Sequence, residues 1–218
     1  MTKTILCYGD SNTWGCPPRR HFGDMPRYGV DVRWGGVVRT ALGIDCAVIE
    51  EGLGGRTTVW DDPVEGEHKN GKTYLTPCLA SHRPLDLVVV MLGTNDLKHR
   101  FGLSAADIAA GAAALVDLIH SSGTGPGGTK PGVLLICPPP VGRLDLFASM
   151  FEGAAEKSPQ LACHFEREAN AHGCAFLDAG KVIRSSDIDG IHLEVDAQQT
   201  LGHAVAQAIK RLPGWPAG

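Results

Sequence analysis

The segment Gly9-Asp10-Ser11-Asn12 stands where the apolar run Thr4 to Tyr8 ends. A buried strand that ends in this way places a small hydroxyl residue at the open edge of a sheet, where α/β folds keep their ligands. A serine hydroxyl attacks a carbonyl only when a neighbouring imidazole takes its proton and a carboxylate orients that imidazole. Ser11 is therefore a candidate nucleophile, and the chain must also supply a histidine and an acid.

The segment Asp189-Gly190-Ile191-His192 offers both groups. Its carboxylate comes three residues before the imidazole, in a glycine-containing turn just ahead of the last predicted helix. On one turn the two side chains can face the same way, which predicts His192 as the base and Asp189 as its orienter. Because Asp-x-x-His is a short motif that also arises by chance, a capping aspartate before a surface histidine is the alternative.

Acyl transfer further needs hydrogen-bond donors aimed at the developing oxyanion. Gly52-Leu53-Gly54-Gly55-Arg56 follows the second apolar run, and its glycines allow a backbone N–H to approach a substrate closely. Gly93-Thr94-Asn95-Asp96 follows the third run, and the Asn95 amide is a neutral donor. Taken separately, these segments are equally compatible with a tight turn and with a helix cap or Asx-turn.

The elements that must position these residues are five apolar runs separated by helical segments. Near-continuous apolar strands that alternate with helices indicate a parallel sheet covered on both faces. A strand order that begins 2-1-3 would bring Ser11, Gly55 and Asn95 together at the topological switch point. The predicted strands are Thr4 to Tyr8, Ala47 to Ile49, Leu85 to Leu92, Val133 to Cys137 and Ala175 to Leu177.

Capping patterns place three of the helices. Ser104 with Asp107 is typical of a capping box, and the last helix runs up to Pro213. Asp31 is the expected cap of a helix that Gly43 closes.

Three stretches show no such periodicity: residues 16 to 30, 60 to 84 and 138 to 155. We expect them to form the walls of a pocket beside Ser11. Trp14, three residues past the nucleophile, is either a wall of the acyl pocket or a core residue.

Composition bounds the function. A chain of 218 residues with 43% hydrophobic and 20% charged residues is expected to form one α/β domain over residues 1 to 218. The net charge of −4 argues against nucleic acid or an anionic membrane as partner and favours a small-molecule substrate. No segment is typical of a signal peptide or a membrane span, which predicts a cytoplasmic protein. The seven scattered cysteines indicate neither disulfides nor a zinc site.

Three other functions were weighed. Gly66 to Thr73 satisfies the Walker A pattern, but it follows Asp61-Asp62-Pro63 rather than an apolar strand, so a polar surface loop is favoured. A second alternative is a non-catalytic flavodoxin-like binding module, in which Ser11 caps the first helix and the turns hold a cofactor phosphate; the negative charge of Asp10 would repel that phosphate. A third is metal catalysis, since His164 and Glu168 share a helical face, but no third ligand accompanies them. We therefore expect neither a cofactor nor a metal.

The four segments in this order resemble those of the SGNH hydrolases of the GDSL esterase and lipase superfamily. The resemblance covers the whole chain and implies a flavodoxin-like three-layer α/β/α fold with a five-stranded parallel sheet. It implies Ser11, His192 and Asp189 as the catalytic triad, and the Ser11 N–H, the Gly55 N–H and the Asn95 side chain as the oxyanion hole.

Within that superfamily, four further segments are most similar to bacterial arylesterases with acyltransferase and perhydrolase activity: Ile5-Leu6-Cys7, Asp31-Val32-Arg33-Trp34, Glu50-Glu51-Gly52-Leu53 and Met91 to Asp96. These relatives assemble as octamers, so the resemblance implies a homo-oligomer. Some of them have Ser-Ala in place of Gly54-Gly55, which leaves Gly54 as an alternative donor next to the acyl group. A carbohydrate acetylesterase is the alternative function.

Overall fold

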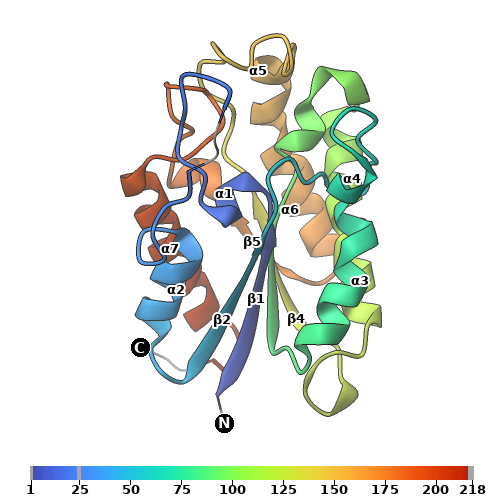
Figure 1. The fold of residues 1–218 in the computed structure, drawn as a ribbon. Helices are drawn as coiled ribbons and strands as arrows, with labels where there is room; N and C mark the ends of the chain where they lie inside the picture. The colour runs from blue at the N-terminus through green and yellow to red at the C-terminus, as the bar shows by residue number, and fades with distance from the viewer. Residues whose placement is uncertain (1, 24–25, 216–218) are drawn as a thin grey trace.

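The computed structural model describes residues 2–23 and 26–215. Five parallel strands form one sheet in the order β2-β1-β3-β4-β5 (Figure 1). The predicted α/β fold and the predicted start of the strand order are confirmed, and each predicted run overlaps one strand. The strands are β1 (Lys3–Gly9), β2 (Cys46–Gly52), β3 (Leu87–Met91), β4 (Gly132–Cys137) and β5 (Ala175–Asp178).

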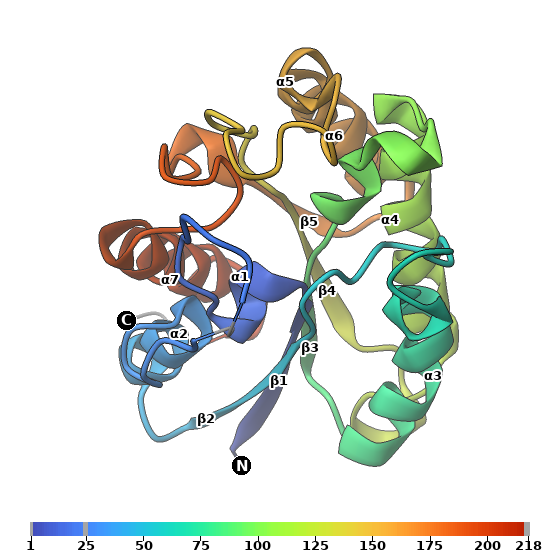
Figure 2. The ribbon, with the colours of Figure 1, turned by 45° about the horizontal axis from the view of Figure 1, so that its top comes forward.

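Helices cover both faces of the sheet (Figure 2). Successive strand residues point to opposite faces, so Leu6 and Tyr8 enter one core while Ile5 and Cys7 enter the other. The first core packs against α3 (Gly71–His82), α4 (Ala105–Ser121) and α6 (Leu161–Ala171); the second packs against α2 (Trp34–Leu42) and α7 (Val195–Lys210). Short helices α1 (Ser11–Trp14) and α5 (Ala154–Lys157) lie at the carboxyl end of the sheet.

Two of the predicted caps are confirmed, and one is wrong. Ser104 and Asp107 form the capping box of α4, and Gly43 closes α2. However, α2 begins at Trp34, and Arg33 rather than Asp31 is its N-cap residue, without a side-chain cap. The Arg33 guanidinium instead forms a paired hydrogen bond with the Glu50 carboxylate.

Residues 71 to 82, which lie in a stretch without predicted periodicity, form helix α3. The helix carries Pro77 in its interior, which removes a backbone donor and hides the helix from a prediction based on breaker residues. The Walker-like segment therefore does open a helix, contrary to our expectation. A phosphate at this helix would need the N–H groups of its first turn. Two of them, those of Lys72 and Thr73, donate to the Asn70 side chain instead. No strand leads directly into it, since β2 ends at Gly52.

The segment between β5 and α7 returns over the carboxyl end of the sheet. Its tight turn closes through hydrogen bonds from the Gly190 N–H to the Ser186 carbonyl and from the Ser186 N–H to the His192 carbonyl. Gly190 has φ +78°, and a Cβ there would lie 2.7 Å from the Arg143 carbonyl oxygen. Only glycine satisfies both constraints, so this turn fixes the position of Asp189 and His192.

The seven cysteines form no disulfide within the described residues. Across residues 2–23 and 26–215, no helix has both the length and the apolar character that a membrane span requires.

We expect Gly190→Ala to lower the free energy of unfolding by about 3 kcal/mol, because it adds both a left-handed alanine and a steric clash. Gly173→Ala is the matched control, since Gly173 also has positive φ but a Cβ there would meet no atom within 4 Å. Urea unfolding of both variants measures the difference. Equal losses would show that the turn does not constrain position 190.

Candidate active site

Ser11 opens helix α1 directly after β1. The N-cap residue of α1 is Asp10, whose carboxylate accepts the Asn12 N–H at 2.9 Å. The binding-module alternative requires the Ser11 hydroxyl to cap this helix, but Asp10 has that role. The Ser11 hydroxyl faces the imidazole of His192 instead.

Three side chains predicted from distant parts of the sequence meet at this point. The Nε2 atom of His192 lies 3.1 Å from the Ser11 Oγ atom, and its Nδ1 atom lies 2.7 Å from Asp189 Oδ2. All three residues are buried. This is the arrangement in which an imidazole takes a hydroxyl proton while a carboxylate fixes its orientation.

The Asp189 carboxylate has four hydrogen-bond donors around it. Oδ1 accepts the N–H groups of Ile191 and His192, and Oδ2 accepts the His192 ring and the Arg19 N–H. Burial alone would raise the pKa of Asp189, but these hydrogen bonds and the nearby imidazole lower it. Asp189 does not cap α7, whose N-cap residue is Glu194. The capping alternative is therefore excluded.

The Asp189 carboxylate also sets the protonation of His192. Burial would lower the pKa of the His192 imidazole, yet the hydrogen bond to Asp189, with a contribution from Cys16, raises it above its ordinary value. His192 is thus a stronger base than a free imidazole. Its ring edge also packs against Phe147, with ring centroids 6.0 Å apart.

Asn95 lies on the same side of the sheet, in the short turn after β3. Its Nδ2 atom donates to the Arg56 carbonyl at 3.1 Å and lies 3.4 Å from Asp10 Oδ2. Burial raises the pKa of Asp10 to about 6. The neighbouring Asp96 accepts the N–H and the hydroxyl of Thr58, which ties this turn to the glycine segment.

Charged side chains hold the turn of Gly54 and Gly55. Gly55 has φ +81°, and a Cβ there would lie 2.4 Å from the Glu65 carboxylate. The Gly54 carbonyl accepts the Lys69 ammonium at 2.8 Å, and Glu65 pairs with the buried Lys98. In the described part of the chain, no hydrogen bond uses the backbone N–H of Ser11 or of Gly55. Both N–H groups are available to a ligand.

These groups line one cavity of about 300 Å³. All three stretches expected to form its walls contribute: Arg19 and Phe22, then Glu65 and Lys69, then Phe147, Met150 and Phe151. Asp24 and Met25 of the first stretch lie outside the described residues. The lining is completed by Ser11, Gly54, Gly55, Asn95, Lys98, Ile191 and His192.

Trp14 is not among the described residues that line this cavity. Arg27 lies over its ring at 5.1 Å and donates to its carbonyl oxygen. The geometry therefore gives no support to Trp14 as a wall of the acyl pocket.

Sequence patterns did not reveal the residues that hold Ser11, His192 and Asp189 together. The Asn12 side chain donates to the Ile191 carbonyl at 3.2 Å, which links helix α1 to the turn that carries His192. Gln198, fully buried on α7, donates to the Asn12 carbonyl. Arg19 acts through its backbone. None of these contacts carries a motif, and only the uncommon buried glutamine on the apolar face of a helix is a signal.

The two candidate metal ligands from the sequence, His164 and Glu168, both lie on α6. Glu168 pairs with Arg167 and His172 instead. In the described ranges, the one group of three side chains arranged for a metal ion is Glu51, Cys78 and His82, which lies elsewhere in the fold.

Comparison with known proteins places this geometry in context. The model of the GDSL-like lipase/acylhydrolase family matches residues 7–200. A solved aryl esterase from M. smegmatis is 43% identical, with a TM-score of 0.92 over 97% of this chain and 100% of that chain. A carbohydrate acetylesterase from Sinorhizobium meliloti is 41% identical, with a TM-score of 0.91 over 94% of this chain and 97% of that chain. A search among curated proteins found no match.

We expect Asp189→Asn to lower the pKa of His192 below that of a free imidazole, because burial then acts without the carboxylate that opposes it. NMR titration of the His192 ring protons measures the change. Asp117→Asn is the control, since Asp117 pairs with the surface residue His172. An unchanged His192 titration in Asp189→Asn would contradict the assigned pairing.

Proposed function

Because the chain belongs to the GDSL-like lipase/acylhydrolase family, we propose that it is a serine esterase that hydrolyses small carboxylic esters through an acyl-enzyme. The observation that carries the proposal is the unbroken chain of hydrogen bonds from Ser11 through His192 to Asp189. The Ser11 end of this chain lies in a cavity large enough for a small ester.

In the proposed acylation step, the Ser11 oxygen attacks the ester carbonyl while His192 removes its proton. The charge on the imidazolium that forms is balanced by Asp189, whose lowered pKa keeps it ionised. His192 then gives the proton to the departing alcohol or phenol. In deacylation, water attacks the acyl-enzyme by the same route. Another alcohol or a peroxide in place of water would make the enzyme an acyltransferase or perhydrolase.

We assign the oxyanion hole to the N–H groups of Ser11 and Gly55 and the Asn95 amide. The two backbone donors have no other use in the described structure, and Asn95 is held by the Arg56 carbonyl. The second Asn95 hydrogen has only the long 3.4 Å contact with Asp10, so an oxyanion can compete for it. Gly54 also lines the cavity, and its carbonyl oxygen accepts a hydrogen bond from the Lys69 ammonium.

The substrate class follows from the lining. Phe147, Phe151 and Met150 give an apolar wall suited to a short acyl or aryl group, as in the similar aryl esterase. Arg19, Glu65, Lys69 and Lys98 give a polar rim that could bind hydroxyl groups, which favours the carbohydrate acetylesterase as the second candidate. Rates on aryl acetates and on acetylated sugars distinguish the two.

The whole chain is proposed to act as one domain within a homo-oligomer. The resemblance to octameric relatives supports this, as do the exposed apolar side chains Trp60, Val64 and Tyr74. A cytoplasmic location and the lack of a nucleic-acid partner stay predictions.

Ser11→Ala is expected to lower kcat for p-nitrophenyl acetate by at least about 10⁴-fold, because no other group can form the acyl-enzyme. The urea midpoint should stay near that of the wild type. Ser81→Ala, which changes a hydroxyl on α3, is the control and should retain activity. Substantial hydrolysis by Ser11→Ala would reject Ser11 as the nucleophile.

Asn95→Ala is expected to lower kcat by about 10²-fold with little change in KM, since the oxyanion exists only in the transition state. Steady-state kinetics on the same ester measures both constants. Asn170→Ala on the exposed face of α6 serves as the control. A rise in KM without a fall in kcat would assign Asn95 to substrate binding instead.

Hydrolysis rates should fall along the p-nitrophenyl acetate, butyrate and octanoate series, because a cavity of about 300 Å³ lies at the small end of the usual range. Phe22→Ala, which opens the mouth of the cavity, should raise the octanoate rate relative to acetate. Val64→Ala is the control, as Val64 is exposed and is not a lining residue. Equal rates along the series would contradict the assigned acyl pocket.

A further inference from the structure

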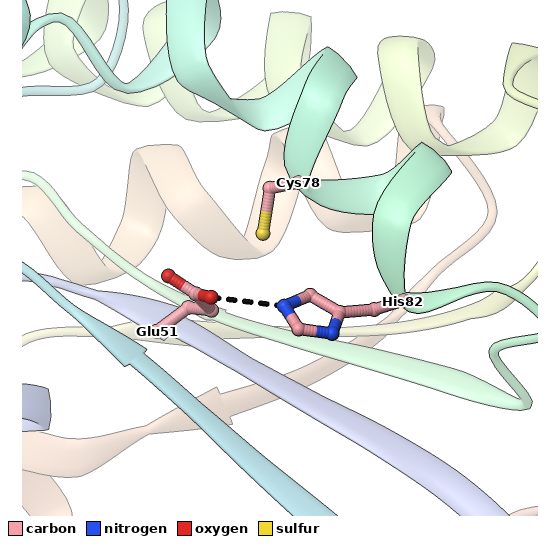
Figure 3. Close-up of side chains that lie close together, drawn as sticks. All are labelled: Glu51, Cys78 and His82. Atoms are coloured by element: carbon pink, nitrogen blue, oxygen red, sulfur yellow. Dashed lines mark hydrogen bonds and ion pairs between the residues drawn. The ribbon is translucent and has the colours of Figure 1, made fainter.

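A second cluster of reactive side chains lies outside the catalytic cavity. Cys78 and His82 are four residues apart on α3 and so share one face of the helix, which points to Glu51 on β2 (Figure 3). One ligand atom from each residue lies within 4.8 Å of the other two. None of the three lines the catalytic cavity.

The structure assigns to Glu51, Cys78 and His82 a binding site for a divalent cation of the zinc class. A thiolate, an imidazole and a carboxylate are the ligands that zinc takes in proteins, whereas magnesium and calcium prefer oxygen ligands alone. Three protein ligands leave a fourth tetrahedral position for water.

The geometry needs little adjustment for this ion. In tetrahedral coordination with bonds of about 2.0–2.3 Å, the ligand atoms around one zinc ion lie about 3.3–3.8 Å apart. The His82 Nε2 atom already lies 2.9 Å from Glu51 Oε1, and the Cys78 sulfur points toward both (Figure 3). A small rotation of the side chains would bring all three onto one ion.

The charged groups near the Cys78 thiol are the Glu51 carboxylate and the Arg56 guanidinium. On binding, the thiol proton passes to solvent, and the proton on Nε2 moves to Nδ1 so that the neutral imidazole can coordinate. The thiolate and the carboxylate then carry two negative charges against the single positive charge of Arg56, so the site attracts the ion.

The location of the three ligands indicates how an ion could reach them and what its binding would stabilise. Glu51 lines a surface cavity of about 540 Å³, through which an ion and its water can reach this carboxylate. Bound metal would fix the end of β2 to α3. Since β2 leads into the Gly54–Gly55 turn, the ion would stabilise this part of the fold without entering the ester chemistry.

Equilibrium dialysis of the metal-free full-length chain against Zn²⁺ alone tests the proposal. Wild type should bind one ion that Cys78→Ser and His82→Gln each weaken by more than about 100-fold, since changes outside the ligand shell already cost 10–100-fold. With Co²⁺ as the probe, wild type should show a thiolate-to-cobalt charge-transfer band that Cys78→Ser abolishes.

Two controls match these variants. Cys163→Ser changes an exposed thiol on α6, and His172→Gln changes a histidine that pairs with Asp117 and Glu168 but has no thiol partner in the described structure. Both should keep the ion. Because Cys78 is buried and its variant could fail to fold, His82→Gln, whose side chain is 29% exposed, decides the question. Ester hydrolysis by His82→Gln shows that this variant is folded.

Absence of Zn²⁺ binding by wild type would overturn the proposal. So would full binding by folded His82→Gln, or a cobalt–thiolate band that survives Cys78→Ser. The Glu51–His82 contact would then be an ordinary ion pair between a strand and a helix.

Discussion

The buried carboxylate of Asp189 is the constraint on which the site depends. A charge without solvent is stable only when hydrogen bonds replace the water it has lost. Four donors do so here, from Arg19, Ile191 and the backbone and ring of His192. Three of them come from the histidine turn and the fourth from the loop after α1, so the same contacts that stabilise the charge also bring two loops together. The base strength and orientation of His192 follow from this one interaction.

The sheet brings the remaining groups to that carboxylate. With β1 between β2 and β3, the segments that follow these strands open at one edge, and helices diverge to opposite faces there. Ser11, the Gly54–Gly55 turn and Asn95 each follow a different strand. Buried polar contacts then fix their relative positions: Asp96 binds Thr58, Asn95 binds the Arg56 carbonyl, and Lys69 binds the Gly54 carbonyl.

The strands and the four chemical segments could be predicted because apolar runs and strand-end residues depend on local sequence, and the start of the strand order followed from requiring these segments to meet. Other features depend on contacts across the fold. Helix α3 contains Pro77, and its place in the structure comes from packing on β1 and α4 rather than from its own periodicity. Arg33 is the N-cap residue of α2, and its side chain pairs with Glu50 on β2. Arg19 donates to Asp189 through its backbone N–H, which every residue except proline has. The residue type at position 19 therefore gives no indication of this role. Trp14 lies three residues after Ser11 in the sequence, but Arg27 lies over its ring.

The proposed mechanism requires Ser11 to be activated by His192 and Asp189. Labelling of the intact protein with a fluorophosphonate, followed by peptide mass spectrometry, detects this activation, because only an activated serine reacts. We expect one adduct, on Ser11, which His192→Ala abolishes in a protein that remains folded. An adduct on a different serine, or equally fast labelling of Ser11 without His192, would contradict it.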